Sequence, residues 1–287
     1  MDIRVRDATA DDIPSIEELA RKFFFSVGIP NYQIHFQCAG LPWQVAVNGN
    51  NELVAFNANH GLPNGVSMGY QLICNPKYQG RGISKFFDTM HFSTQPMLGN
   101  VSGDSIKRYR FDIWAEKLVE YSGFAQCWLL RKPRDLEGFW IQPLRKETMK
   151  DLVNYDRDVE GFERSTFIEK WCLGEEATTL LCFDSERKCR GYGTLRSCGS
   201  YYTLSPLYAD DDGIAEVLFY QLFHKLKSSD HICMLFPARN RLLTRLVSRL
   251  QLRLTTIELR TYQTGTRFMI RNLKMGKVYC MHDYWPV

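Results

Sequence analysis

The sequence predicts a mixed α/β (α+β) protein with two similar domains in tandem, each a mainly antiparallel mixed sheet flanked by helices. Short apolar runs of period two alternate with longer runs of period three to four, which is the pattern of strands alternating with helices. This cadence occurs twice along the 287 residues, a length that allows two compact domains, each with its own core. We place the domains at 1–133 and 139–287, with the charged, proline-bearing linker 132–138 between the two runs.

The first domain is predicted to have the order β-α-β-β-β-α-β-α-β. Thr9 and the acidic residues after it are typical of a helix start, and Asn48–Asn51 is typical of a hairpin turn. A loop rich in Gly, Ser and Asp is expected to end at Asp104. The predicted elements are strand 3–6, helix 10–26, strands 43–47, 53–59 and 67–74, helix 83–95, strand 107–113, helix 115–122 and strand 126–130.

The second domain repeats the alternation after residue 138. Its predicted elements are strand 139–144, a helix from 146, helix 166–173, strands 178–183, 191–196 and 201–207, helix 213–227, strand 232–236, helix 239–250 and strand 255–261.

Composition excludes several classes of function. The net charge of +4 is small and spread along the chain, so it gives no case for a nucleic-acid partner. Nine scattered cysteines without metal-type spacing indicate reduced thiols rather than a disulfide framework or a metal site. The start of the chain lacks a signal-like apolar region, and no apolar run reaches the ~18 residues of a membrane span. A cytoplasmic protein that does not bind membranes is expected.

The most informative segment is 75–84, Asn-Pro-Lys-Tyr-Gln-Gly-Arg-Gly-Ile-Ser, between a predicted strand and a predicted helix. Gly80 and Gly82 allow a tight turn whose successive amides point into one concavity, which favours a phosphate ligand. Gln79, Arg81 and Ser84 add side-chain donors. Neither the Rossmann nor the Walker pattern of glycines is present. A turn that only joins strand to helix is the structural alternative.

Residues 68–84 resemble the acyl-CoA pyrophosphate loop of the GCN5-related N-acetyltransferases (GNAT), whose signature is Gln/Arg-x-x-Gly-x-Gly/Ala. The resemblance extends over residues 2 to about 132 through the order of elements. It implies acetyl-CoA as co-substrate, with the pantetheine pairing to one of two splayed strands, here 67–74 and 107–113. The implied cofactor-binding residues are Leu72, Ile73, Cys74, Gln79, Gly80, Arg81, Gly82, Ile83 and Ser84.

The second half resembles the YitH/HolE-type acetyltransferase domain over about 139–264, mainly through the run Pro206-Leu-Tyr-Ala-Asp. It lacks the glycine loop. The three carboxylates of 210–212 stand at the corresponding helix start, where they favour the helix dipole but repel a diphosphate. A degenerate phosphate loop is therefore expected in this half.

Catalytic residues are less clearly indicated. The family pattern Asn-x-x-Ala-x-x-Leu-Tyr-x-x-x-Gly-Phe, counted back from Gly123, places Val119 where the acid tyrosine should stand. Tyr121 and Tyr109 are the substitutes nearby, although packing is the commoner role for Tyr121. The candidate bases are Asp112 at a strand end and Glu52 at a strand start, each of which could instead be a solvated carboxylate. The remaining titratable candidates are His35 and His60, of which His60 should lie far from the phosphate loop.

The resemblance therefore implies an N-acetyltransferase that transfers acetyl from acetyl-CoA to a small amine or amino-acid-like acceptor. Two alternatives stay open. A CoA-binding or interaction module without catalysis would fit the missing tyrosine, and a protein N-terminus or lysine could be the acceptor. No feature of the sequence indicates the oligomeric state.

Overall fold

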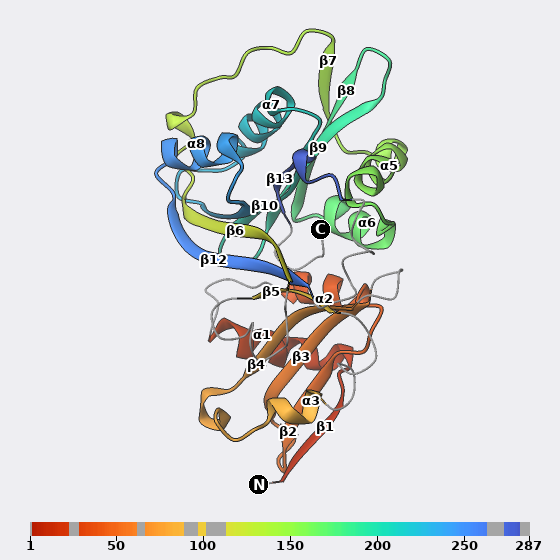
Figure 1. Ribbon diagram of the computed structural model, residues 1–287, viewed down its shortest axis with the longest axis vertical. Coiled ribbons are helices and arrows are strands. Elements are labelled where there is room, and N and C mark those ends of the chain that lie inside the picture. The colour runs from red at the N-terminus through yellow and green to blue at the C-terminus, as the bar shows by residue number, and fades with distance from the viewer. Residues whose placement is uncertain are drawn as a thin grey trace.

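The computed structural model describes residues 2–22, 29–61, 67–88, 97–101, 113–262 and 273–281. Within them, 13 strands form one continuous sheet in the order β1-β2-β3-β4-β5-β12-β6-β11-β10-β9-β8-β7, with β13 paired to β10. The N-terminal and C-terminal halves form two lobes, which are joined by the long strands β6 and β12 (Figure 1). None of the described helices has the length and apolar character needed to cross a bilayer.

The first half has an antiparallel run of strands that ends in a parallel pair. β1 to β4 pair antiparallel in sequence order, and β4 pairs parallel with β5. The strands are β1 Ile3–Asp7, β2 Gln44–Asn48, β3 Leu53–Gly61, β4 Ser67–Cys74 and β5 Met97–Val101; the helices are η1 Ala10–Asp12, α1 Ile13–Arg21, α2 Ile29–Gln37, η2 Pro76–Tyr78 and α3 Ser84–Asp88.

The second half follows the prediction closely. Its strands are β7 Phe139–Pro143, β8 Ala177–Asp184, β9 Cys189–Ser197, β10 Tyr202–Ala209, β11 His231–Pro237, β12 Arg253–Tyr262 and β13 Val278–Cys280. Its helices are η4 Lys146–Thr148, α5 Met149–Glu160, α6 Ser165–Leu173, α7 Asp212–Phe223, α8 Arg241–Arg249 and η6 Met275–Lys277. The sequence did not predict β13.

A strand near the end of each half pairs with strands of the other half. β6 Ile113–Phe124 pairs with β11 and β12, and β12 also pairs with β5. The predicted helix 115–122 is therefore wrong. Leu118 and Val119 are both buried and pack into different hydrophobic clusters, because neighbouring side chains of a strand point to opposite faces. Pairing with a strand on each side outweighs the helical spacing of the local sequence.

Three further local predictions of the first half are corrected. Residues 97–101, expected in a loop, form β5. Residues 126–130, expected as a strand, contain the short 3₁₀ helix η3 Cys127–Leu129. Residues 29–37, which had no element assigned, form α2. The predicted strand 107–113 lies outside the described residues except for Ile113, where β6 begins.

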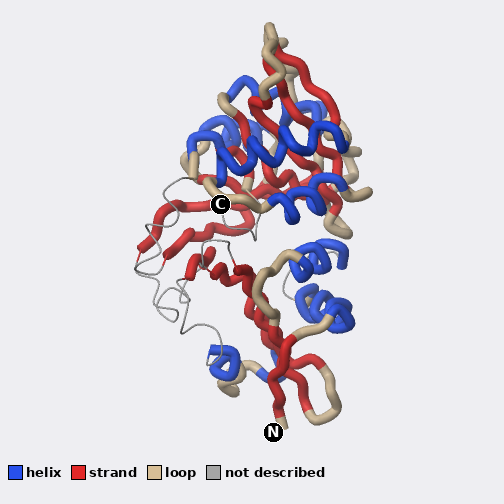
Figure 2. Tube along the Cα trace, turned by 90° about the vertical axis from the view of Figure 1, so that its right-hand side faces the viewer, coloured by secondary structure: helices blue, strands red, loops and turns tan. Residues whose placement is uncertain are grey.

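Helices cover both faces of the sheet in each half (Figure 2). In the first half α1 and α2 pack on one face and Ile83 and Phe87 on the other. In the second half α7 and α8 cover one face and α5 and α6 the opposite one. Because α1 has buried residues at Ile13, Ile16 and Leu19, its apolar stripe follows the spacing of three to four that the sequence shows.

Candidate functional site

The glycine loop lies at the end of β4 and has the backbone that the sequence predicted. Gly80 and Gly82 have φ of 75° and 76°, in the left-handed region that L side chains rarely adopt. A Cβ atom at Gly80 would meet nothing within 4 Å, and one at Gly82 would meet only the Lys85 side chain at 3.9 Å. The loop is therefore open on the side that these glycines face, as a cradle for a ligand requires.

Side chains around the loop fix its shape. Asn75 accepts a hydrogen bond from the Lys77 N–H at 3.2 Å, and the Gln79 side-chain amide donates to the Cys74 carbonyl at 3.2 Å. The Arg81 guanidinium lies 5.6 Å from the centre of the Tyr78 ring. These contacts hold Gln79 and Arg81 beside the two glycines.

β4 and β5 separate partway along their length. Ser67, Met68 and Gly69 pair with residues 97–99, whereas the next residues of β5, Asn100 and Val101, pair with β12 and no longer with β4. This parting leaves one edge of β4 beyond Gly69 without a described strand partner. The described strand that parts from β4 is thus 97–101, whereas the predicted strand 107–113 lies outside the described residues except for Ile113.

The pairing register shows which main-chain groups of β4 face this gap. The Asn75 N–H donates to the Val54 carbonyl at 2.8 Å, and the register continues without a shift from Cys74 to Leu72. In an antiparallel pair, residues alternate between bonding the partner strand and facing away from it. Ile73 therefore bonds to β3, while the main chains of Leu72 and Cys74 face the gap.

A bulge interrupts β4 where the strands part. Ala58 lies opposite Gln71 and Asn59 opposite Gly69, so Tyr70 is the extra residue, and such a residue is left unpaired in the ladder. The neighbouring Gln71 is buried and accepts a 2.7 Å hydrogen bond from the Tyr32 hydroxyl. Its amide nitrogen has no hydrogen-bond partner among the described residues. Sequence reasoning missed this Tyr32–Gln71 pair, since no motif contains it.

Of the three predicted catalytic residues, Glu52 and Tyr121 are described and lie in different parts of the fold. Asp112 and Tyr109 lie outside the described residues. Glu52 accepts a 2.7 Å hydrogen bond from the Asn48 amide, which also donates to the Tyr78 hydroxyl at 3.2 Å. Glu52 is thus beside the phosphate loop and six residues of β3 away from the bulge, a separation of about 20 Å.

Tyr121 is a packing residue of the second half. It lies on β6, where it pairs with Met234 and Leu254, and its ring stacks on Phe236 at 5.5 Å. Because 113–124 is a strand, the family's helical pattern cannot be read onto it, and Val119 does not occupy the position of an acid tyrosine. The structure assigns no general acid among the described residues of this segment.

A buried histidine pair lies where α2 meets α6. His35 Nδ1 and His60 Nε2 are 3.2 Å apart, and the His35 ring lies 5.4 Å from Phe167. Burial lowers the pKa of His60 to about 3, with partial opposition from a backbone hydrogen bond at Cys38. His60 is at the end of β3 away from the phosphate loop, as predicted, and it is neutral at pH 7.

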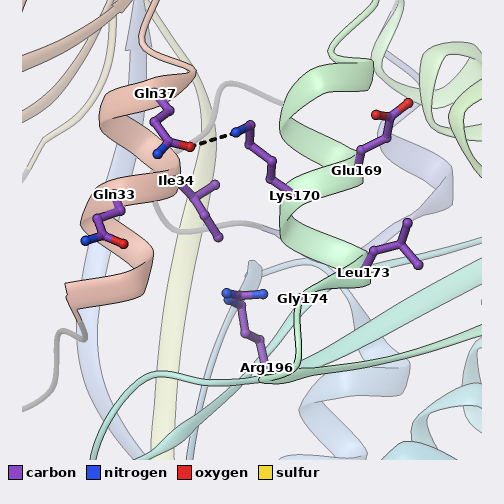
Figure 3. Close-up of a pocket in the computed structure, with 8 residues that line it drawn as sticks. All are labelled: Gln33, Ile34, Gln37, Glu169, Lys170, Leu173, Gly174 and Arg196. Carbon is purple, nitrogen blue, oxygen red and sulfur yellow. Dashed lines mark hydrogen bonds between the residues drawn. The ribbon is translucent and has the colours of Figure 1, made fainter.

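Polar side chains bridge the two halves both at the surface and in the interior of the seam. Lys170 donates to Gln37 at 2.7 Å, and Arg196 donates to Asn31 at 3.0 Å. A groove of about 380 Å³ lies here between α2 and α6 (Figure 3). The Arg196 guanidinium also donates to the Trp171 carbonyl at 2.8 Å, so this cation bonds to α2 of the first half and to α6 of its own half.

Comparisons with known proteins bear on the family of the second half and on the fold of the whole chain. A model of the acetyltransferase (GNAT) domain matches residues 152–279. No curated protein matches the sequence. A structure of a proposed acetyltransferase from Pyrococcus horikoshii is 16% identical, with a TM-score of 0.73 and coverage of 99% of this chain and 96% of that one.

Two other solved structures resemble nearly the whole chain. A tandem GNAT protein from the clavulanic acid biosynthesis pathway is 10% identical, with a TM-score of 0.67 and coverage of 91% and 98%. A GCN5-related N-acetyltransferase from Sphaerobacter thermophilus is 12% identical, with a TM-score of 0.62 and coverage of 91% and 95%. Residues 152–279 are therefore similar to a GNAT domain, and the chain as a whole has the fold of a tandem GNAT protein.

Proposed function

We propose that the protein is an acyl-CoA-dependent N-acyltransferase that binds acetyl-CoA in its first half and transfers the acetyl group to a small amine or amino-acid-like acceptor. The observation that carries this proposal is the gap between β4 and β5, which starts at a bulge and leads along β4 to an open glycine loop. This combination offers an extended ligand a strand edge and a cradle for its phosphates.

The residues that would hold the co-substrate follow from the register. The N–H and C=O of Leu72 and the N–H of Cys74 face the gap and are available to pantetheine amides. The Cys74 carbonyl is not included, because it already accepts a hydrogen bond from Gln79. The amides and side chains of 79–84 would hold the diphosphate, with Gly80 and Gly82 permitting its close approach. Ile73 and Ile83 are buried and would support the site by packing.

The thioester end of the co-substrate would lie at the bulge of β4. When bound, the co-substrate supplies an acyl group activated as a thioester. The unpaired main chain at Tyr70 stands where the strands part, so its N–H is the donor that we assign to the negative charge developing on the acyl oxygen. Orientation of the amine at this point converts a bimolecular step into an effectively unimolecular one. Proton acceptance from the amine is assigned to water, since Glu52 is about 20 Å away.

Binding is tested with a matched pair of glycine substitutions. Gly82→Glu places a carboxylate in the cradle and should weaken acetyl-CoA binding about 10- to 100-fold, as expected for losing one charge-assisted hydrogen bond. Gly138→Glu is the control, because the φ of Gly138 is 75°, close to the 76° of Gly82, and a Cβ atom there would also meet open space. Calorimetric titration should show unchanged affinity for the control. Equal affinity in both variants would reject the assignment of the loop.

Turnover separates the enzyme from a module that only binds CoA. Release of free thiol from acetyl-CoA is measured over a panel of small amines, amino acids and peptides with free N-termini or lysines. We expect repeated turnover with a small amine or amino acid. Stoichiometric binding without thiol release would instead support the binding module, and turnover with peptides alone would support a protein acetyltransferase.

A further inference from the structure

The second half repeats the parting of strands seen in the first half. β10 pairs parallel with β11 only at Tyr202 and Thr203, just as β4 pairs with β5 only over its first three residues. β10 also has a register shift against β9 between Leu204 and Leu207, at the place that corresponds to the bulge of β4. The second half therefore has the gap in which a GNAT fold would receive pantetheine.

This gap is filled by the chain itself. β13 enters it antiparallel to β10, with Cys280 opposite Leu207 and Val278 opposite Tyr208. On the other wall, Met281 bridges to Leu235, and its N–H donates to the Leu235 carbonyl at 2.8 Å. The segment thus bonds to both separated strands, which is how an added strand is recognised.

Side chains of the segment belong to the core on both faces. Val278 and Met281 pack into the cluster under α5 and α6, and Tyr279 and Cys280 pack into the cluster under α7 and α8. All four are at most 4% exposed. Displacement of this strand by a ligand would expose both clusters to water, which the hydrophobic effect opposes.

Carboxylates take the place of phosphates at the end of β10. Asp211 accepts from the Ile214 N–H at 2.9 Å and thereby caps α7. Lys277 forms a 2.7 Å ion pair with Asp210, and the Tyr279 hydroxyl donates to Asp212 at 2.7 Å. Two residues of the entering segment therefore bind the acidic helix start that a diphosphate would otherwise approach.

We propose that residues 273–281 are an intramolecular occupant of the second-half cleft and exclude acyl-CoA from it, so that one chain binds a single CoA, in its first half. The main chain of β13 stands in for pantetheine, and the carboxylates of 210–212 stand in for the diphosphate. The count of one CoA rests on the proposed function, whereas the occupation of the second cleft does not.

The first test counts bound CoA by native mass spectrometry of the full chain at saturating CoA. At saturating CoA, one equivalent is expected for the natural chain and for Gly138→Glu. A second measurement, at a CoA concentration near the dissociation constant of the natural chain, should show that Gly82→Glu has lost most of the bound CoA. Two equivalents, or one that survives undiminished in Gly82→Glu, would overturn the inference.

The second test is hydrogen exchange of the amides of 278–281, which needs no bound CoA. We expect them to exchange as slowly as the central strands β9 and β10, and at the same rate with and without CoA. Exchange as fast as in the exposed turn 185–188 would overturn the inference. Should no CoA bind at all, the proposed function fails, while slow exchange still supports the occupied cleft and fast exchange still rejects it.

Discussion

Acid sensitivity should originate in part from one buried histidine. His60 is fully buried on β3, and burial lowers its pKa from 6.5 to about 3. In the unfolded chain the same imidazole takes up a proton below pH ~6.5. The unfolded state therefore binds more protons than the native state between pH 3 and 6.5, so the free energy of unfolding rises with pH across this window. Above pH 6.5 the whole contribution of His60 to stability is present.

The size of the effect follows from the two pKa values. Between pH 7.5 and 5.5 the unfolded chain gains about one proton at His60, which lowers the free energy of unfolding by about 1.4 kcal/mol. The groups packed around the ring include His35, whose Nδ1 is 3.2 Å from His60 Nε2, and the indole of Trp43.

Urea denaturation at pH 7.5, 6.5 and 5.5 measures this dependence, and His60→Gln isolates it. The variant changes the absolute stability, so the readout is the difference in slope against pH. We expect a slope shallower by about 1.4 kcal/mol over these two pH units. His224→Gln replaces an exposed histidine and serves as the control. Equal slopes for His60→Gln and the natural chain would refute the reasoning.

Two further substitutions test buried polar contacts. Arg164→Met should lower the free energy of unfolding by about 3–5 kcal/mol, because it leaves the buried carboxylates of Asp156 and Glu160 without their cation. Arg245→Met is the control, since it removes an exposed ion pair with Glu216 and should lower the free energy of unfolding by less than about 1 kcal/mol in the same denaturation assay. Tyr32→Phe should cost about 1–3 kcal/mol because the Gln71 oxygen loses its donor, and an unchanged denaturation midpoint would contradict that reading of the pair.

Much of the fold could be predicted from local pattern alone. The hairpin turn at 48–51, the strand 67–74 and the glycine loop after it are each specified by residues near one another in the sequence. The elements of the second half from β7 to β12 were likewise placed within a few residues, since each has a clear period and a turn or cap at its ends.

Two of the errors fall where strands of the two halves meet. Residues 113–124 have apolar side chains at helical as well as strand spacing, and only β11 and β12, more than 100 residues away in sequence, provide the partners that make them a strand. Residues 97–101 become β5 for the same reason, through β4 and β12. Pairing energy of this kind is not local, so a single sequence does not reveal it.

The sequence by itself determined the repeated alternation of strands and helices and the glycine loop, because glycines at 80 and 82 and a preceding strand are local requirements. The tertiary structure alone decided which predicted site residues lie near one another, placing Glu52 beside the loop and Tyr121 in the second core. It also decided that the second cleft holds β13. These outcomes depend on contacts between distant segments, which are selected by burial and strand pairing over the whole sheet.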